Sequence, residues 1–241
     1  LRQPHRRSAD KLIIVRVNAM DTAHFAPDVA AVVRPGLDIL NLPKPESVDA
    51  VREAVRAIAA AEKAHGVPRP VRLLLNIESP RALRLAAELA RADERVMGLQ
   101  VGLGDLFEPL GIARREVAAV AQVLFAVRMA AGEAGIEAYD GAFANVRDTE
   151  GYLAEAHMAR RFGLAGKTCI HPSQIALANQ AFRPTDAEIR HAAQVLEAAK
   201  RHEAGGTGAY MVDGQMVDLP FVRRAQDVVA LARRLNIHPF D

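Results

Sequence analysis

The chain has 241 residues, half of them hydrophobic and a quarter charged, which is the composition of an ordinary globular protein. A formal net charge of +2 and the absence of Trp argue against a nucleic-acid-binding surface. The single cysteine, Cys169, excludes a disulfide framework and a Cys-rich zinc site, and it favours a reducing cytoplasm. The longest apolar helical stretch is interrupted by Gln122, so we expect no membrane span.

Short apolar runs alternate with longer amphipathic segments along the first three quarters of the chain. The runs expected to form strands are Leu12–Asn18, Asp38–Pro43, Val71–Glu78, Val96–Gly102, Ile136–Asp140 and Lys167–His171. The segments expected to form helices are Ser47–His65, Pro80–Ala92, Arg115–Ala134 and Thr149–Phe162. Such alternation predicts βα units and a parallel sheet.

The pattern changes after His171-Pro172. We expect a helix opened by a capping box at Thr185–Glu188, followed by a flexible connection at Gly205–Gly208. A hairpin is expected at Ala209–Val217, with its turn at Asp213-Gly214, and a last helix from Pro220 toward Leu235. We therefore divide the chain into an α/β part, residues 1–180, and a helix-hairpin-helix extension of the same domain, residues 181–241. The extension is expected to pack on the first part or on a neighbouring subunit.

Six strands leave two architectures open, a doubly wound open sheet and an eight-stranded barrel with two strands unaccounted for. Polar side chains follow at least four of the strands, at Asn18, Glu78, Asp105 and His171. Because strand carboxyl ends carry the chemistry of TIM barrels, this arrangement favours the barrel.

Two carboxylates, Glu78 and Asp105, close neighbouring apolar runs. Acids at the same end of adjacent strands can share one divalent cation, and a set of oxygen ligands indicates Mg²⁺ or Mn²⁺ over zinc. The alternative is that each acid only caps the helix that follows it. Gly102 and Gly104 flank the turn and would let backbone amides approach a substrate carboxylate closely.

Arg16 lies within a strand flanked by β-branched residues, where a charge must be paired or must face a cavity. We favour a role in binding a substrate carboxylate or a developing enolate oxygen over a purely structural salt bridge. Asp218 could cap the last helix, or it could bring a general acid or base if the hairpin folds over a barrel mouth.

Three further residues invite a catalytic interpretation that we regard as weaker. Cys169 and His171 would share one face of a strand, but no acid is evident to orient the histidine, and a lone cysteine in a strand is usually a packing residue. Lys44, between two prolines, could be imagined as a Schiff-base lysine. The competing metal site makes a surface or anion-facing role more plausible.

At these residues the chain resembles the citrate lyase beta-subunit family of the HpcH/HpaI aldolase superfamily, which includes the malyl-CoA and citramalyl-CoA lyases. The likeness runs from about Ile13 to about Leu231. The matching stretches are Val15–Asn18, Leu37–Lys44, Asn76–Leu83, Gly102–Leu106, Gly166–Gln174 and Asp213–Pro220.

The resemblance implies a TIM barrel that assembles as trimers or hexamers, with Mg²⁺ on Glu78 and Asp105. Arg16 would bind the oxo-acid portion of the substrate, Gly104 would line the substrate site, and Asp218 would reach into a neighbouring subunit's site. The implied reaction splits a 3-hydroxyacyl thioester of coenzyme A or an acyl carrier, such as malyl-CoA, citramalyl-CoA or a citryl thioester, into a 2-oxo acid and an acyl thioester. Two alternatives stay open: a class II aldolase acting on free 2-oxo acids, and a catalytically weak subunit that binds an acyl thioester.

The chain departs from the family pattern in two ways. Members begin with two further strands, so we expect upstream residues in the native protein. Many members also carry Glu where this chain has Gly104, which is expected to alter the surroundings of the metal or the choice of substrate.

Overall fold

The computed structural model describes residues 11–203 and 209–237, and it divides the chain into two compact units. The first unit extends to Ala181 and the second begins at Phe182. Among the described helices, none combines the length and the apolar character needed to cross a lipid bilayer.

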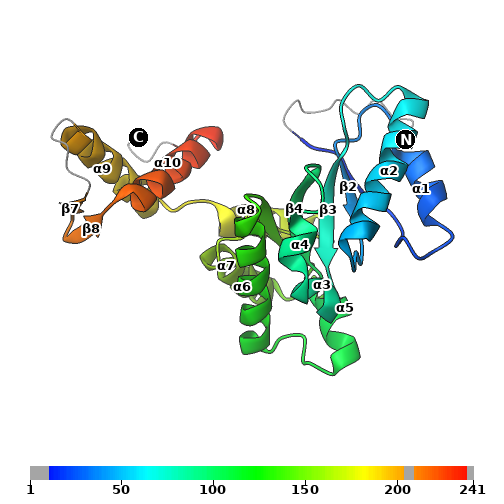
Figure 1. Ribbon diagram of the computed structural model, residues 1–241. Helices are drawn as coiled ribbons and strands as arrows, with labels where there is room; N and C mark the ends of the chain where they lie inside the picture. The colour runs from blue at the N-terminus through cyan, green and yellow to red at the C-terminus, as the bar shows by residue number, and fades with distance from the viewer. Residues whose placement is uncertain (1–10, 204–208, 238–241) are drawn as a thin grey trace. The chain divides into compact units, whose positions relative to one another are not determined.

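The first unit is built on a six-stranded sheet whose strands are all parallel and follow one another in chain order (Figure 1). The strands are β1 (Ile14–Arg16), β2 (Ile39–Leu42), β3 (Arg72–Ile77), β4 (Val96–Val101), β5 (Glu137–Asp140) and β6 (Gly166–Lys167). All six predicted strands are therefore present, and the predicted α/β class with a parallel sheet is confirmed. The continuous burial of β2 and most of β3 reflects a sheet covered on both faces.

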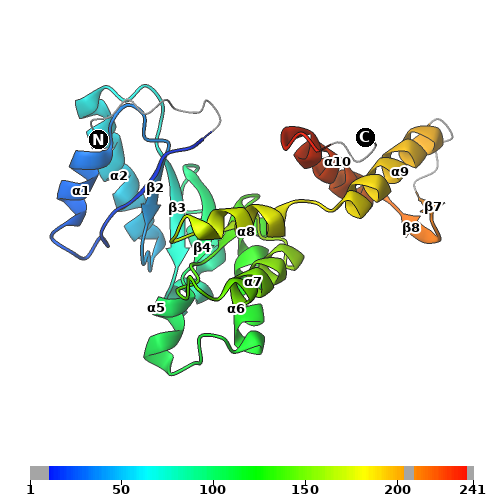
Figure 2. The same cartoon turned by 180° about the vertical axis from the view of Figure 1, so that it is seen from behind.

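Helices follow the strands and pack against them and against each other. In the first unit they are α1 (Phe25–Val32), α2 (Val48–His65), α3 (Pro80–Arg84), α4 (Ala86–Ala90), α5 (Leu103–Phe107), a 3₁₀ turn (Glu108–Leu110), α6 (Val117–Glu133), α7 (Thr149–Arg161) and α8 (Ser173–Phe182), the last of which ends one residue inside the second unit. Helix α4 contacts β3 and β4 and lies between α2 and α6 (Figure 1). Figure 2 shows the same unit from behind, with α8 on that side.

Local signals in the sequence explain where the predicted helices begin and end. Ser47 caps α2 by accepting a hydrogen bond from the amide of Ala50, and Gly66 ends it in the left-handed region. Ser79 caps α3 in the same way, with Pro80 in the first turn. The predicted helix Pro80–Ala92 is interrupted at Leu85, and α1, α5 and α8 were not predicted.

The predicted strand Lys167–His171 is wrong beyond its first residue. The amide of Thr168 still donates to the carbonyl of Asp140, but the amide of Ile170 donates to the side chain of Gln174, 2.9 Å away. The Gln174 amide group in turn donates to the carbonyl of Phe143. A buried glutamine thus replaces the neighbouring strand as hydrogen-bond partner, so the chain leaves the sheet.

The second unit contains α9 (Asp186–Glu203), the hairpin β7 (Tyr210–Val212) and β8 (Gln215–Val217), and α10 (Leu219–Arg234). Thr185 and Glu188 form the predicted capping box, with reciprocal bonds of 2.7 and 3.2 Å. Asp213 and Gly214 both have positive φ, as the predicted hairpin turn requires. The two helices and the hairpin share a small apolar core of their own. The predicted connection Gly205–Gly208 lies outside the described residues.

Candidate active site

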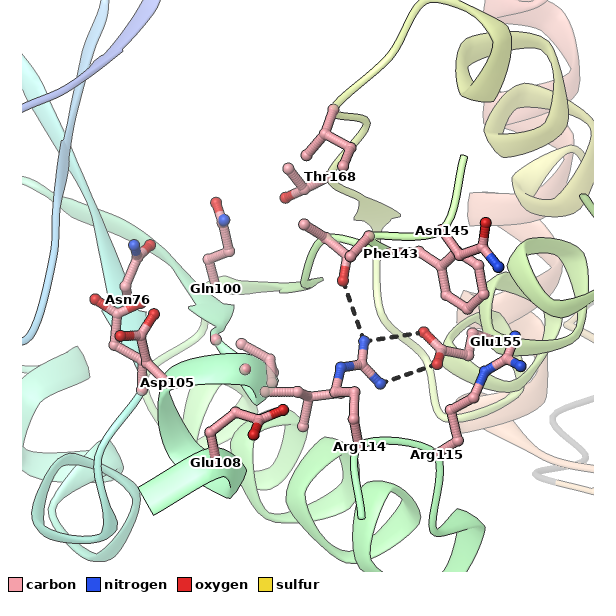
Figure 3. A pocket seen from close by; sticks show the side chains of 18 of the residues that line it. Asn76, Gln100, Asp105, Glu108, Arg114, Arg115, Phe143, Asn145, Glu155 and Thr168 are labelled. Carbon is pink, nitrogen blue, oxygen red and sulfur yellow. Dashed lines mark hydrogen bonds and ion pairs between the residues drawn. The ribbon is translucent and has the colours of Figure 1, made fainter. Parts of the chain in front are cut away.

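The carboxyl ends of β1, β3 and β4 meet at a pocket of about 580 Å³. Arg16 is the last residue of β1, Asn76 lies near the end of β3, and Gln100 lies beside Asn76 in the register of β4. All three side chains line the pocket, together with Glu78 and Asp105. Figure 3 shows Asn76 and Asp105 on one side of this pocket, opposite Arg114 and Glu155.

Glu78 is buried directly after β3. Its Oε1 accepts a hydrogen bond from the backbone amide of Lys44 at 3.2 Å and lies 3.7 Å from Nη2 of Arg16. Burial raises the pKa of the Glu78 carboxyl, and the nearby Arg16 guanidinium opposes that rise. Because Ser79 caps the following helix, Glu78 does not serve as its cap.

Asp105 lies in the first turn of the short helix α5, and not at the end of a strand as the apolar run had suggested. The strand ends at Val101, four residues earlier, and the amide of Leu106 bonds back to the carbonyl of Gly102 to close the helical turn. The Asp105 side chain is about half exposed, and its Oδ1 lies 2.8 Å from the ammonium of Lys44. Asp105 is thus a solvent-exposed carboxylate that lines the same pocket as the buried carboxylate of Glu78.

Lys44 links the two acids, since its amide bonds Glu78 and its ammonium pairs with Asp105. The Asp105 carboxylate raises the pKa of the lysine. Lys44 has a φ of 48°, a conformation that an L-residue rarely adopts, and it stands between the buried residues Pro43 and Pro45. The predicted anion-facing role of Lys44 agrees with these contacts.

The two glycines of the turn have different surroundings. A Cβ on Gly102 would press on the side chain of Glu78 and lie 2.6 Å from its Oε2, so only glycine permits this approach. A Cβ on Gly104 would meet nothing within 4 Å, so the pocket has room there for the larger side chain that the resemblance leads one to expect.

A second charged group lines the opposite side of the pocket (Figure 3). Arg114 forms a bidentate pair with Glu155 and donates a further bond to the carbonyl of Ala142. Glu155 also lies 3.2 Å from the fully buried ammonium of Lys167, which pairs with Asp140 at 2.6 Å. Sequence reasoning missed this group, although the adjacent arginines at 114 and 115 before an apolar helix were a usable signal.

Two other predicted strand-end residues do not join the site. Asn18 donates through its backbone and side chain to Asp28, which lowers the pKa of that carboxyl. His171 bonds Ser173, whereas Cys169 lies 3.2 Å from the Tyr152 hydroxyl. Cys169 and His171 both lie beyond β6, so the expectation that they share a strand face is wrong.

Asp218 belongs to the second unit, where it occupies the N-cap position of α10 without making a side-chain cap bond. Its Oδ1 is buried and has no hydrogen-bond partner among the described residues. The capping role considered for this side chain is therefore not seen. The structure brings Arg16, Glu78, Gly104 and Asp105 together at one pocket of the first unit, and Asp218 belongs to the second unit.

The donor set suits a hard divalent cation. Within the described residues no cluster of three or more His, Cys, Asp or Glu side chains occurs, so a cation here would be held by the Glu78 and Asp105 carboxylates alone. Mg²⁺ is commonly bound by one or two carboxylates, with water and substrate oxygens completing its shell. In the described part of the chain, Oε2 of Glu78 and Oδ2 of Asp105 take no hydrogen bond, which leaves one oxygen of each acid available.

Comparison with known proteins gives consistent matches over most of the chain. A family model described as HpcH/HpaI aldolase/citrate lyase matches residues 2–172. The citrate lyase subunit beta of Escherichia coli strain K12 is 37% identical over 228 residues, which span 93% of this chain and 75% of that protein. The L-malyl-CoA/beta-methylmalyl-CoA lyase of Rhodobacter capsulatus is 28% identical in an alignment of 249 residues, gaps included, that covers 95% of this chain and 78% of that protein.

Solved structures match the fold as well. A citrate lyase from Burkholderia xenovorans LB400 superposes with a TM-score of 0.81 at 26% identity, covering 93% of this chain and 73% of that one. The CitE protein of Mycobacterium tuberculosis, solved in complex with magnesium, acetoacetate and coenzyme A, gives a TM-score of 0.72 at 32% identity. That match covers 91% of this chain and 78% of that one.

Proposed function

The chain belongs to the HpcH/HpaI aldolase/citrate lyase family, and we propose that it is a Mg²⁺-dependent carbon–carbon lyase acting on acyl thioesters. It cleaves, or in reverse forms, a 3-hydroxyacyl thioester, with a 2-oxo acid and an acyl thioester as the products of cleavage. The observation that carries the proposal is the pair Glu78 and Asp105, which face one pocket and contact the same lysine. The names of the relatives, citrate lyase subunit beta and malyl-CoA lyase, support the same reaction class.

Each residue has a role that follows from its place. Glu78 and Asp105 would hold the ion, which would supply a positive charge to polarise the hydroxyl and the nascent carbonyl oxygen of the substrate. Arg16, permanently charged and more than half exposed, binds the carboxylate of the oxo acid and offsets charge on its oxygens. Gly104 leaves space for that part of the substrate beside Asp105.

Asp218 is proposed to exchange a proton with the carbon of the thioester enolate, in the site of a neighbouring copy. A buried carboxylate oxygen without a partner supports a role for this side chain outside its own helix cap. The proposal therefore includes a homo-oligomer, a trimer or a multiple of trimers. It also includes a (β/α)₈ barrel architecture for the sheet, a cytoplasmic location and tolerance of Mn²⁺ in place of Mg²⁺.

The test combines metal binding with turnover. Mg²⁺ is titrated into the protein with glyoxylate, pyruvate or oxaloacetate present, and cleavage is assayed with malyl-CoA, citramalyl-CoA and citryl thioesters. Glu78→Gln and Asp105→Asn should each abolish linked binding and turnover. Glu108→Gln, which alters another acid lining the same pocket, serves as the matched control and should retain both.

Two outcomes would count against the proposal. Full turnover by a Glu78→Gln, Asp105→Asn double variant in buffer containing Mg²⁺ would refute the metal assignment. Aldol cleavage of free hydroxy-oxo acids without any thioester activity would move the protein to the class II aldolases.

A further inference from the structure

Lys44 contacts both proposed metal carboxylates from a constrained turn. Its backbone amide donates to Glu78 Oε1 at 3.2 Å, and its ammonium lies 2.8 Å from Asp105 Oδ1. The flanking Pro43 and Pro45 are buried, and the backbone of Lys44 is left-handed. The backbone of this residue is therefore fixed, whereas the four-carbon side chain is about half exposed and free to take other rotamers.

The charges around the two acids balance only when no metal is bound. Glu78 and Asp105 supply two negative charges, and Arg16 and Lys44 supply two positive charges within 3.7 and 2.8 Å of them. Adding a divalent cation to this cluster, with both basic side chains in place, would leave it with two excess positive charges. Because like charges at such separations repel, binding of the ion favours withdrawal of a basic side chain.

Lys44 is the side chain placed to withdraw. Its ammonium pairs directly with the more exposed acid, Asp105, whereas the Arg16 guanidinium stands farther off, at 3.7 Å from the buried Glu78. Withdrawal of the ammonium leaves the backbone bond to Glu78 intact, so the buried carboxylate stays oriented while Oδ1 of Asp105 is freed in addition to Oδ2.

We propose that Lys44 is the resident counter-ion of this site: its ammonium occupies the cation position beside Asp105 in the metal-free protein and is displaced when Mg²⁺ binds. The inference rests on the proposed function, which assigns Glu78 and Asp105 to the metal. Lys44 is a positioning residue that lowers the affinity for Mg²⁺ while keeping the empty site neutral and ordered.

The first experiment measures Mg²⁺ affinity by isothermal titration calorimetry with MgCl₂ alone at fixed ionic strength. Lys44→Met keeps the backbone amide and the length of the stem but removes the charge. It should bind Mg²⁺ about threefold more tightly or better, the range set by a partly exposed ion pair. Lys44→Arg keeps the charge and should not tighten binding. Arg91→Met, which removes the exposed pair with Glu133, should leave the affinity unchanged.

The second experiment follows the ammonium itself. Lysines of the wild-type protein are acetylated briefly with and without Mg²⁺, and the extent at each lysine is read by mass spectrometry. Modification at Lys44 should rise when Mg²⁺ is added, whereas the exposed Lys63 on α2 should not change.

The outcomes separate the two proposals. Equal or weaker Mg²⁺ binding by Lys44→Met, or unchanged labelling of Lys44, would overturn the inference while leaving the metal site in place, provided that wild type binds Mg²⁺ and Glu78→Gln does not. Failure of the wild-type protein to bind Mg²⁺ through Glu78 would overturn the metal assignment and the inference together.

Discussion

Replacing Gly102 with alanine tests the close packing of the turn against the buried acid. The new Cβ would lie 2.6 Å from Oε2 of Glu78 and would also press on the Cβ of that residue, well inside ordinary contact distance. The backbone φ of Gly102 is −115°, a negative value that L-residues also adopt, so the effect is one of crowding and not of a left-handed backbone. Glu78 cannot give way easily because it is buried and held by Lys44.

The expected cost follows from this geometry. Inserting a methyl group into a tightly packed site destabilises a protein by about 1–3 kcal/mol. Gly104→Ala is the matched control, since it adds the same group two residues farther along in open space. Alanine is favoured over glycine within a helix by about 0.5–1 kcal/mol, so this control should be neutral or stabilising.

Urea unfolding followed by far-UV circular dichroism measures both variants, and titration with MgCl₂ reports on the position of Glu78. Gly102→Ala should lower the unfolding free energy and weaken Mg²⁺ binding, whereas Gly104→Ala should do neither. If the two variants unfold alike and bind Mg²⁺ alike, the argument from close packing is wrong.

Two further predictions concern charges away from the metal site. Lys167→Met leaves the buried carboxylate of Asp140 without its cationic partner and should lower the free energy of unfolding, measured in urea, by about 3–5 kcal/mol. Adding Asp140→Asn should recover part of the loss, and no recovery would contradict the pairing. Hydrogen bonds from Asn18 hold the pKa of Asp28 below its ordinary value of 3.8. The stability that this carboxylate contributes is therefore fully present above pH 3.8, and it is lost as the pH falls through the lowered pKa. The difference in unfolding free energy between wild type and Asp28→Asn should therefore narrow on acidification, and a constant difference would argue against the bond.

The sequence predicted the parallel strands and the longer helices because apolar runs and capping residues are local signals. Ser47, Ser79 and the Thr185 capping box mark helix starts where the structure has them. The end of β6 could not be predicted, because the partner that draws Ile170 out of the sheet is the side chain of Gln174, held in turn by Phe143. Such a contact depends on the folded arrangement.

The candidate site was predicted in part, because the positions of its two acids follow from local signals in the sequence. Glu78 and Asp105 follow strands, so their meeting at one edge could be inferred from the order of the elements. The pairing of Lys44 with Asp105 could not, since it depends on a left-handed residue between two prolines. The adjacent arginines at 114 and 115 indicate a charged position, but the Arg114–Glu155 pair joins residues 41 positions apart, so the local pattern does not identify the partner.

The two acids differ in how firmly the fold holds them. Glu78 follows a strand inside the sheet, whereas Asp105 sits on α5, a helix of five residues that is too short to persist through its own backbone bonds. A ligand that bridges the two carboxylates therefore stabilises α5 against local unfolding. Binding of that ligand is therefore coupled to the folding of α5. Amide hydrogen exchange across Leu103–Phe107 should become slower when the ligand is bound.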